Sequence, residues 1–146
     1  MTSSSFNTNA YLHYMNPKQI WGNLGVSDLE RTAKFYNALG FKQHSPPSKD
    51  LVAFSFGEAG FVICFFLKEV LARNVKAEMA DTTKVNEVVF TISCTGKAEA
   101  DKWALEVEPA GGKLLSQPET FGPGYYGFTF ADPDGHRFNV FYMPGF

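Results

Sequence analysis

One structural unit occurs twice in this sequence, and the duplication limits the folds that the chain can adopt. In each half an extended segment precedes a helical segment that ends near a glycine, and three short apolar segments follow. The halves align on Phe35 with Trp103, on Gly40 with Gly112, and on Phe54-Ser-Phe56 with Phe128-Thr-Phe130. Such a repeat predicts two curved four-stranded sheets that face one another across a cup. The predicted fold class is therefore α+β, with two βαβββ modules forming a cupped mixed sheet.

The helices and strands have recognisable boundaries. We expect Ser27 to cap the first helix, with Asp28 and Glu30 in its first turn and Gly40 after its end, and we expect a second helix from Lys97 to Ala110. The expected strands are Ile20 to Val26, Phe41 to His44, Leu51 to Phe56 and Phe61 to Leu67, and then Val85 to Ser93, Lys113 to Ser116, Tyr125 to Phe130 and Arg137 to Tyr142.

Length and composition fit one domain. The chain of 146 residues is long enough to bury a core without disulfides or a structural metal. We expect residues 1–16, rich in Ser, Thr and Asn, to be a flexible extension in which His13 is solvated. Residues 17–146 are expected to form the domain, with module one at about 18–67, a partly helical linker at about 68–83 and module two at about 84–143.

Charge and cysteine usage exclude several classes of partner. The formal net charge is −2 with acidic and basic residues interspersed, so the basic patch that a nucleic-acid or anionic-membrane partner requires is absent from the sequence. The longest apolar run, Phe61 to Leu67, is far shorter than the ~20 residues of a membrane span. Residues 1–16 lack the features of a signal peptide. Cys64 and Cys94 are expected to be buried thiols in a reducing cytosol, which predicts a cytoplasmic protein.

A tight turn lies near the C-terminus. In Asp132-Pro133-Asp134-Gly135, Pro133 sets φ for the second turn position and Gly135 supplies the positive φ of a bulged hairpin. The flanking strands are therefore expected to be antiparallel neighbours.

Two separated motifs carry a family resemblance. They are the segment Ala131-Asp-Pro-Asp-Gly-His-Arg-Phe-Asn-Val-Phe141 and the segment Trp21-Gly-Asn-Leu-Gly-Val-Ser-Asp-Leu-Glu-Arg-Thr-Ala-Lys-Phe-Tyr-Asn-Ala-Leu-Gly-Phe41. Together they resemble the vicinal oxygen chelate superfamily, which contains glyoxalase I, bleomycin-resistance proteins and extradiol dioxygenases. The resemblance extends from about Lys18 to Tyr142 and is closest to bacterial lactoylglutathione lyase-related proteins. It implies a homodimer, as is usual in that group.

For the metal-dependent members, the resemblance implies one divalent cation bound at equivalent places in both modules, where it polarises two substrate oxygens. The positions carried over are Trp21, Glu87, Ile63 and Asn139, where the family shows His or Gln, His or Glu, Glu, and Glu. Glu87 is an ordinary ligand and Asn139 a weak one, whereas Trp21 and Ile63 cannot bind a metal. We therefore expect no metal and no other cofactor. His44 and His136 are expected to be solvated or bonded to backbone.

Side-chain alternation along the strands predicts which residues line the cup. Glu87 would lie among apolar side chains there, as a candidate catalytic base or as the counter-ion of a cationic ligand near Trp21; an edge carboxylate that reaches solvent is the alternative. Tyr125 follows a Gly/Pro-rich loop that is expected to form a lip over the cup. The predicted ligand-binding residues are Trp21, Asn23, Ile63, Phe65, Glu87, Val89, Thr91, Tyr125, Asn139 and Phe141.

Two classes of function remain open on these grounds. The first is a metal-independent binder of a small hydrophobic or aromatic molecule in the cup, as the resemblance to bleomycin-resistance proteins implies. The second is an enzyme of the same superfamily, either a lactoylglutathione lyase-like lyase or isomerase or a dioxygenase-type protein, which is metal-dependent or uses Glu87 as base. A cup filled by the fifteen phenylalanines would support neither.

Overall fold

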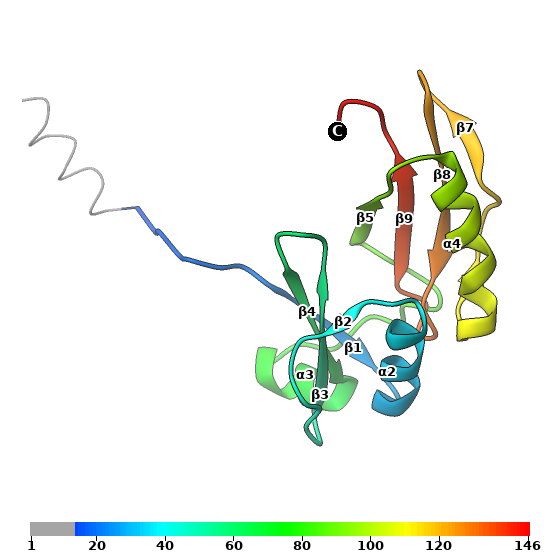
Figure 1. Cartoon of the computed structure of the whole chain (residues 1–146). Coiled ribbons are helices and arrows are strands. Elements are labelled where there is room, and N and C mark those ends of the chain that lie inside the picture. The colour runs from blue at the N-terminus through cyan, green and yellow to red at the C-terminus, as the bar shows by residue number, and fades with distance from the viewer. Residues whose placement is uncertain (1–13) are drawn as a thin grey trace, which may run out of the picture.

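The computed structural model describes residues 14–146, and it has the α+β architecture that the duplication predicts (Figure 1). The expectations for residues 1–13, His13 included, lie outside the described residues. Module one contains β1 (Gly22–Val26), α2 (Leu29–Ala38), β2 (Lys42–Gln43), β3 (Leu51–Phe56) and β4 (Phe61–Leu67). Its sheet has the order β1-β4-β3-β2, with β1 parallel to β4 and the other neighbours antiparallel.

Module two repeats this arrangement. It contains β5 (Val89–Ser93), α4 (Lys97–Ala110), β6 (Lys113–Leu114), β7 (Glu119–Phe121), β8 (Tyr125–Ala131) and β9 (Arg137–Tyr142). The order is β5-β9-β8-β6, with β5 parallel to β9 and the short β7 paired to β8. Helix α3 (Lys68–Val75) opens the connection between the modules. Among residues 14–146, no helix has the length and apolar character that crossing a bilayer requires.

Strand boundaries differ from expectation at several places. β1 begins at Gly22 rather than Ile20, β2 is limited to Lys42–Gln43, and β8 extends to Ala131. β5 begins at Val89 rather than Val85, β6 ends at Leu114 rather than Ser116, and β7 was not predicted. The segment before Val89 instead contains a turn that is anchored to the distant β8–β9 turn, since Thr82 Oγ1 donates to Asp134 O (2.7 Å) and Asn86 Nδ2 donates to Gly135 O (3.0 Å). These hydrogen bonds link segments about 50 residues apart, so local sequence patterns do not predict them.

The first helix is capped by a different residue than predicted. Asp28, not Ser27, is the N-cap, and its carboxylate accepts from Arg31 N at 3.0 Å. Ser27 points elsewhere: its backbone N–H and its hydroxyl both donate to Asp134 Oδ1, each at 3.0 Å. Gly135 has the predicted positive φ, +94°. A side chain there would also meet Thr82 O at 2.3 Å, so the turn requires glycine for space as well as for φ.

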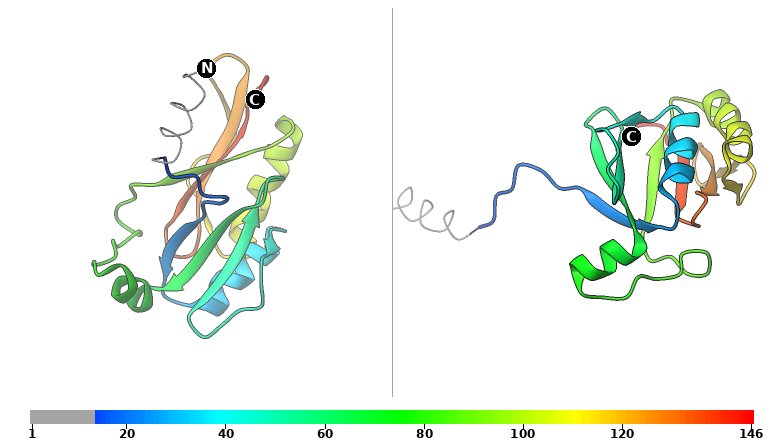
Figure 2. Two further views of the ribbon diagram at one scale, coloured as in Figure 1. Left: turned by 90° about the vertical axis from the view of Figure 1, so that its left-hand side faces the viewer. Right: turned by 90° about the horizontal axis from the view of Figure 1, so that it is seen from below.

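The two sheets share one core. Tyr36 on α2 lies at its centre, with its ring 4.6 Å from that of Phe65 in the first sheet and 6.0 Å from that of Phe138 in the second. Phe138 is also stacked on Phe130, at 5.2 Å between ring centroids and an interplanar angle of 6°. The helix therefore contacts both sheets, as the view from below in Figure 2 shows.

Each sheet buries the face that carries its helix and leaves the other face exposed, which we call its outer face. The buried faces meet directly, because the Phe56 ring of the first sheet lies 6.0 Å from the Phe138 ring of the second. The faces that were expected to line a cup between the sheets are thus the outer faces. The fold class is confirmed, but within one chain the sheets meet through their helix-bearing sides.

Candidate functional site

The outer face of the first sheet carries an apolar hollow beside Trp21. One row across this face runs from Asn23 through Cys64 and Ala53 to His44, and the hydrogen bond from His44 N to Ala53 O (2.8 Å) holds its end. Trp21, just before β1, is 55 % exposed. We call the cavity beside this side chain the Trp21 hollow, and its volume is about 590 Å³. The residues that line it are Lys18, Gln19, Ile20, Trp21, His44, Ala59, Gly60, Phe61, Val62 and Cys64.

Ile63 and Phe65 do not lie on this face. β1 and β4 pair with Gly22 opposite Ile63, so Asn23 shares its face with Cys64. Ile63 and Phe65 are 1 % and 0 % exposed within the core. The prediction that they line the cup with Trp21 and Asn23 is wrong by one residue, and a one-residue shift reverses the face of every side chain in a strand.

The outer face of the second sheet has a polar row at its centre. Asn139 lies between two threonines: Thr129 Oγ1 donates to Asn139 Oδ1 (2.8 Å), and Asn139 Nδ2 donates to Thr91 Oγ1 (3.2 Å). The strand register places Val89, Tyr125 and Phe141 on the same face. The centroid of the Phe121 ring lies 4.5 Å from that of Phe141 and 5.6 Å from that of Tyr125. The predicted common face of Val89, Thr91, Asn139 and Phe141 is confirmed.

Glu87 is not the counterpart of Trp21. The sequence offset that aligns Phe35 with Trp103 also aligns Trp21 with Val89. The same offset aligns the starts of the two helices, because α2 begins as many residues after Val26 as α4 begins after Cys94. Extending the β1–β4 pairing by one residue places Trp21 opposite Val62, and the equivalent pair is Val89 with Arg137.

These four residues do not form a set of ligands for a divalent cation, and the carried-over position Asn139 adds only a weak amide ligand. An indole, two isopropyl groups and a guanidinium are not metal ligands. Across residues 14–146, moreover, His, Cys, Asp and Glu side chains form no cluster of three or more that could hold a metal ion.

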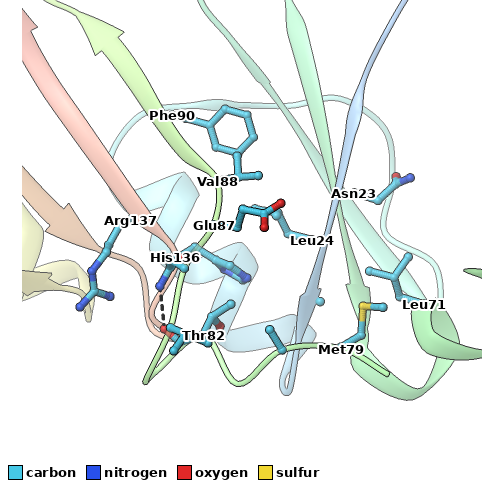
Figure 3. A pocket seen from close by; sticks show the side chains of 14 residues that line it. Asn23, Leu24, Leu71, Met79, Thr82, Glu87, Val88, Phe90, His136 and Arg137 are labelled. Atoms are coloured by element: carbon cyan, nitrogen blue, oxygen red, sulfur yellow. Dashed lines mark hydrogen bonds between the residues drawn. The ribbon is translucent and has the colours of Figure 1, made fainter. Parts of the chain in front are cut away.

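Glu87 lies instead in a cleft between the modules. It is exposed and precedes β5. The cleft, called the His136 cleft, measures about 610 Å³ and lies between β1, β5 and the connecting segment (Figure 3). Its lining is Asn23, Leu24, Gly25, Leu71, Met79, Ala80, Thr82, Val85, Asn86, Glu87, Val88, Phe90, His136 and Arg137. Glu87 and Trp21 thus line different cavities, and the expected pairing of the two is not found.

His136 contradicts the expectation of a solvated or backbone-bonded histidine. It is 4 % exposed, and its Nδ1 lies 2.8 Å from Asp132 Oδ2. The same oxygen accepts from the Tyr36 hydroxyl at 2.7 Å. Burial and then the nearby Asp132 raise the pKa of Tyr36 well above its usual value, so the phenol stays a donor.

Asp132 Oδ1 accepts the backbone N–H groups of Asp134 (3.0 Å) and His136 (2.9 Å). The carboxylate therefore fixes both the turn and the imidazole. His44, by contrast, is exposed, with Nδ1 3.5 Å from Ser55 Oγ.

Comparisons with known proteins agree with this fold. Residues 12–140 match the family described as the Glyoxalase/Bleomycin resistance protein/Dioxygenase superfamily. A hypothetical protein from S. aureus is 32% identical over 92% of this chain and 100% of its own, with a TM-score of 0.79.

More distant solved structures share the fold. A glyoxalase-related enzyme from Fulvimarina pelagi is 23% identical over 88% of this chain and 90% of its own, with a TM-score of 0.76. A lactoylglutathione lyase from Agrobacterium tumefaciens is 22% identical over 90% of this chain and 100% of its own, with a TM-score of 0.66. No curated protein matches the chain.

Proposed function

Because this chain belongs to the glyoxalase/bleomycin resistance protein/dioxygenase superfamily, we propose that it binds a small hydrophobic or aromatic molecule in the Trp21 hollow without a metal ion. The half-exposed indole of Trp21 carries the proposal. It stands at the wall of a cavity of about 590 Å³, a volume typical of small-molecule sites, whose linings are mostly apolar with a few polar groups. A planar ligand stacks on such a ring with a gain of about 0.5–1.5 kcal/mol beyond burial.

The residue types at the family's metal positions support metal independence. Trp21 and Ile63 offer no lone pair that a divalent cation prefers, Asn139 offers one amide oxygen, and Glu87 lines a different cavity from Trp21. A lactoylglutathione lyase-type reaction depends on a cation that polarises adjacent substrate oxygens, and this set of side chains lacks the three good ligands that would hold the cation. The binder is therefore favoured over the metal-dependent enzyme.

A second copy of the chain is proposed to close the hollow. Ile20 and Trp21 are 81 % and 55 % exposed, and a site of this type usually buries most of its ligand's surface. In a two-fold dimer the apolar outer face of one protomer can cover the Thr91–Asn139–Thr129 row of its partner, and the reverse contact is then made as well. The free thiols of Cys64 and Cys94 suit the reducing cytoplasm in which we propose the protein acts.

Tryptophan fluorescence tests the proposed site. A panel of planar aromatic compounds is titrated into the full chain treated with EDTA, and binders are repeated with Trp21→Phe and Trp103→Phe. Trp103 lies on α4, at the position equivalent to Phe35 in the first module. The Trp103→Phe protein should therefore keep the ligand-induced change in fluorescence. Trp21→Phe should abolish that change and weaken binding several-fold. Binding that needs an added divalent metal, or lactoylglutathione lyase activity restored by one, would overturn the proposal.

Sedimentation tests the dimer. We expect a dimer at micromolar concentration, and we expect Ile20→Lys to shift it toward monomer because the substitution places a charge in the proposed interface. Lys42→Glu, on an exposed residue at the far strand of the same sheet, should have less effect. A wild-type chain that sediments as a monomer throughout this range would rule out closure by a second copy.

A further inference from the structure

The His136 cleft is separate from the proposed aromatic site. Asn23, Leu24 and Gly25 of β1 form one side, and Val88 and Phe90 form the other. None of the residues that line it lines the Trp21 hollow. It therefore offers a second place for a ligand, with walls that are largely aliphatic.

The imidazole of His136 is held in one orientation at the base of this cleft. An ionised carboxylate only accepts hydrogen bonds, so Nδ1 carries the proton in the contact with Asp132 Oδ2 at 2.8 Å. In the neutral imidazole, Nε2 then carries the lone pair. Within the described residues, no hydrogen bond to Nε2 is found, although the side chain is about 95 % buried, with 5 % exposed. Among the described residues, the side-chain atom found buried without a hydrogen-bond partner is Asp134 Oδ2 and not His136 Nε2. Since His136 lines the cleft, Nε2 is available to a donor that enters it.

Glu87 adds a negative charge on the same side. Figure 3 shows its carboxylate and the His136 ring both directed into the space between β5 and β1. The other charged residue in the lining is Arg137, whose Nη1 donates to Gly135 O at 3.0 Å and whose guanidinium points away from the cleft. The Glu87 carboxylate and Nε2 of His136 therefore give the cleft two acceptors and one negative charge.

We propose that the His136 cleft binds a small aliphatic amine in its protonated form. The ammonium group donates to Glu87 and to Nε2 of His136, and the hydrocarbon chain lies along Leu24, Val88 and Phe90. An ammonium group has three donors and no acceptor, which matches the Glu87 carboxylate and the Nε2 lone pair of His136. The apolar walls favour a chain of several methylene groups, since each buried CH₂ contributes about 0.8 kcal/mol.

A matched ligand series tests this site. Hexylammonium, 1-hexanol and hexanoate are titrated into the ¹⁵N-labelled full chain in mildly alkaline buffer, where primary amines remain protonated. Hexylammonium should bind most tightly and shift the amide signals of Leu24, Glu87 and Val88. Equal or tighter binding of hexanoate, or the absence of hexylammonium binding, would overturn the proposal.

Variants identify the contacts. Glu87→Gln, at an exposed position, should weaken hexylammonium binding about fivefold, as expected for a partly solvated ion pair, and should leave hexanol binding unchanged. Glu108→Gln, on an exposed glutamate of α4, is the matched control. If Trp21→Phe weakens hexylammonium binding and Glu87→Gln does not, the amine lies in the Trp21 hollow and the cleft proposal fails.

The imidazole can be followed without mutating a buried residue. Long-range ¹H–¹⁵N spectra report the protonation of each ring nitrogen, and the variants His13→Gln and His44→Gln identify the signals that belong to His136. The Nε2 signal of His136 should move on addition of hexylammonium and stay in place with hexanoate. Hexylammonium binding that leaves this signal unmoved would show that His136 does not contact the ligand.

Discussion

The outer faces of the two sheets come from equivalent strands, yet their chemistry differs. On the first, Asn23 and Cys64 lie beside the exposed Trp21 and the apolar hollow. On the second, the equivalent residues Thr91 and Asn139 form a hydrogen-bonded row with Thr129. The buried faces, in contrast, remain alike, with Ile63 and Phe138 at equivalent core positions. The shared core constrains one face of each module, while the outer faces are free to take different roles.

The largest difference is expected between neighbours on opposite faces of β9. Phe138→Ala should lower the free energy of unfolding by about 3–5 kcal/mol, because it removes a fully buried ring from the junction of the sheets. Asn139→Ala, one residue along on the outer face, should cost less than about 1.5 kcal/mol. Urea denaturation measures both. Similar costs for the two variants would contradict the assignment of inner and outer faces.

A smaller effect is expected from the hydrogen bond that joins the modules. Tyr36→Phe deletes the donor to Asp132 Oδ2 and should cost about 1–2 kcal/mol, since Asp132 keeps its bonds from His136. Tyr125→Phe, on the outer face, is the control because no hydrogen bond of its hydroxyl is found within residues 14–146. Thermal and urea unfolding of both variants give the comparison, and a Tyr36→Phe protein as stable as wild type would refute the structural role of this contact.

The smallest effect concerns the two thiols. Burial raises the pKa of Cys64 and, as the largest of several influences, that of Cys94. At a given pH both therefore hold less thiolate than a free cysteine, so alkylation should be slower than for a model thiol and should accelerate as pH rises. Cys64 on the outer face should react before Cys94, which is 8 % exposed. Mass spectrometry after timed alkylation measures the order in which the two thiols react, with Cys64→Ser as reference. If Cys94 reacts before Cys64, the assignment of Cys64 to the outer face is wrong.

Sequence periodicity and turn chemistry predicted the module order, the Gly135 turn and most strands, because these depend on local backbone preferences. The sequence did not predict which face of the sheet carries Ile63. The register of β4 is set by its pairing with β1 and β3, and a shift of one residue moves every side chain to the opposite face. Glu87 was misplaced by two residues, because the equivalent position in β5 depends on the distance to α4, and that distance makes Val89 the counterpart of Trp21.

The role of His136 was missed for a different reason. Its burial depends on Asp132 and on Tyr36, which lies 96 residues before Asp132. A histidine four residues after an aspartate in a tight turn is a sequence signal for the contact between His136 and Asp132. The contribution of Tyr36 to this hydrogen-bond network is visible only in the folded chain.

The contacts of Asp132 and Asp134 have a consequence for synthesis of the protein. The helix α2 emerges from the ribosome early, but Asp134, which accepts from Ser27, is made 107 residues later. At a translation rate of about 5–20 residues per second, this delay is roughly 5–20 s. During that interval the phenylalanine-rich face of the first sheet lacks its contact with Phe138 of β9, and chaperones can bind the part that α2 leaves open. The nascent chain is therefore expected to complete its core only when its last hairpin has been translated.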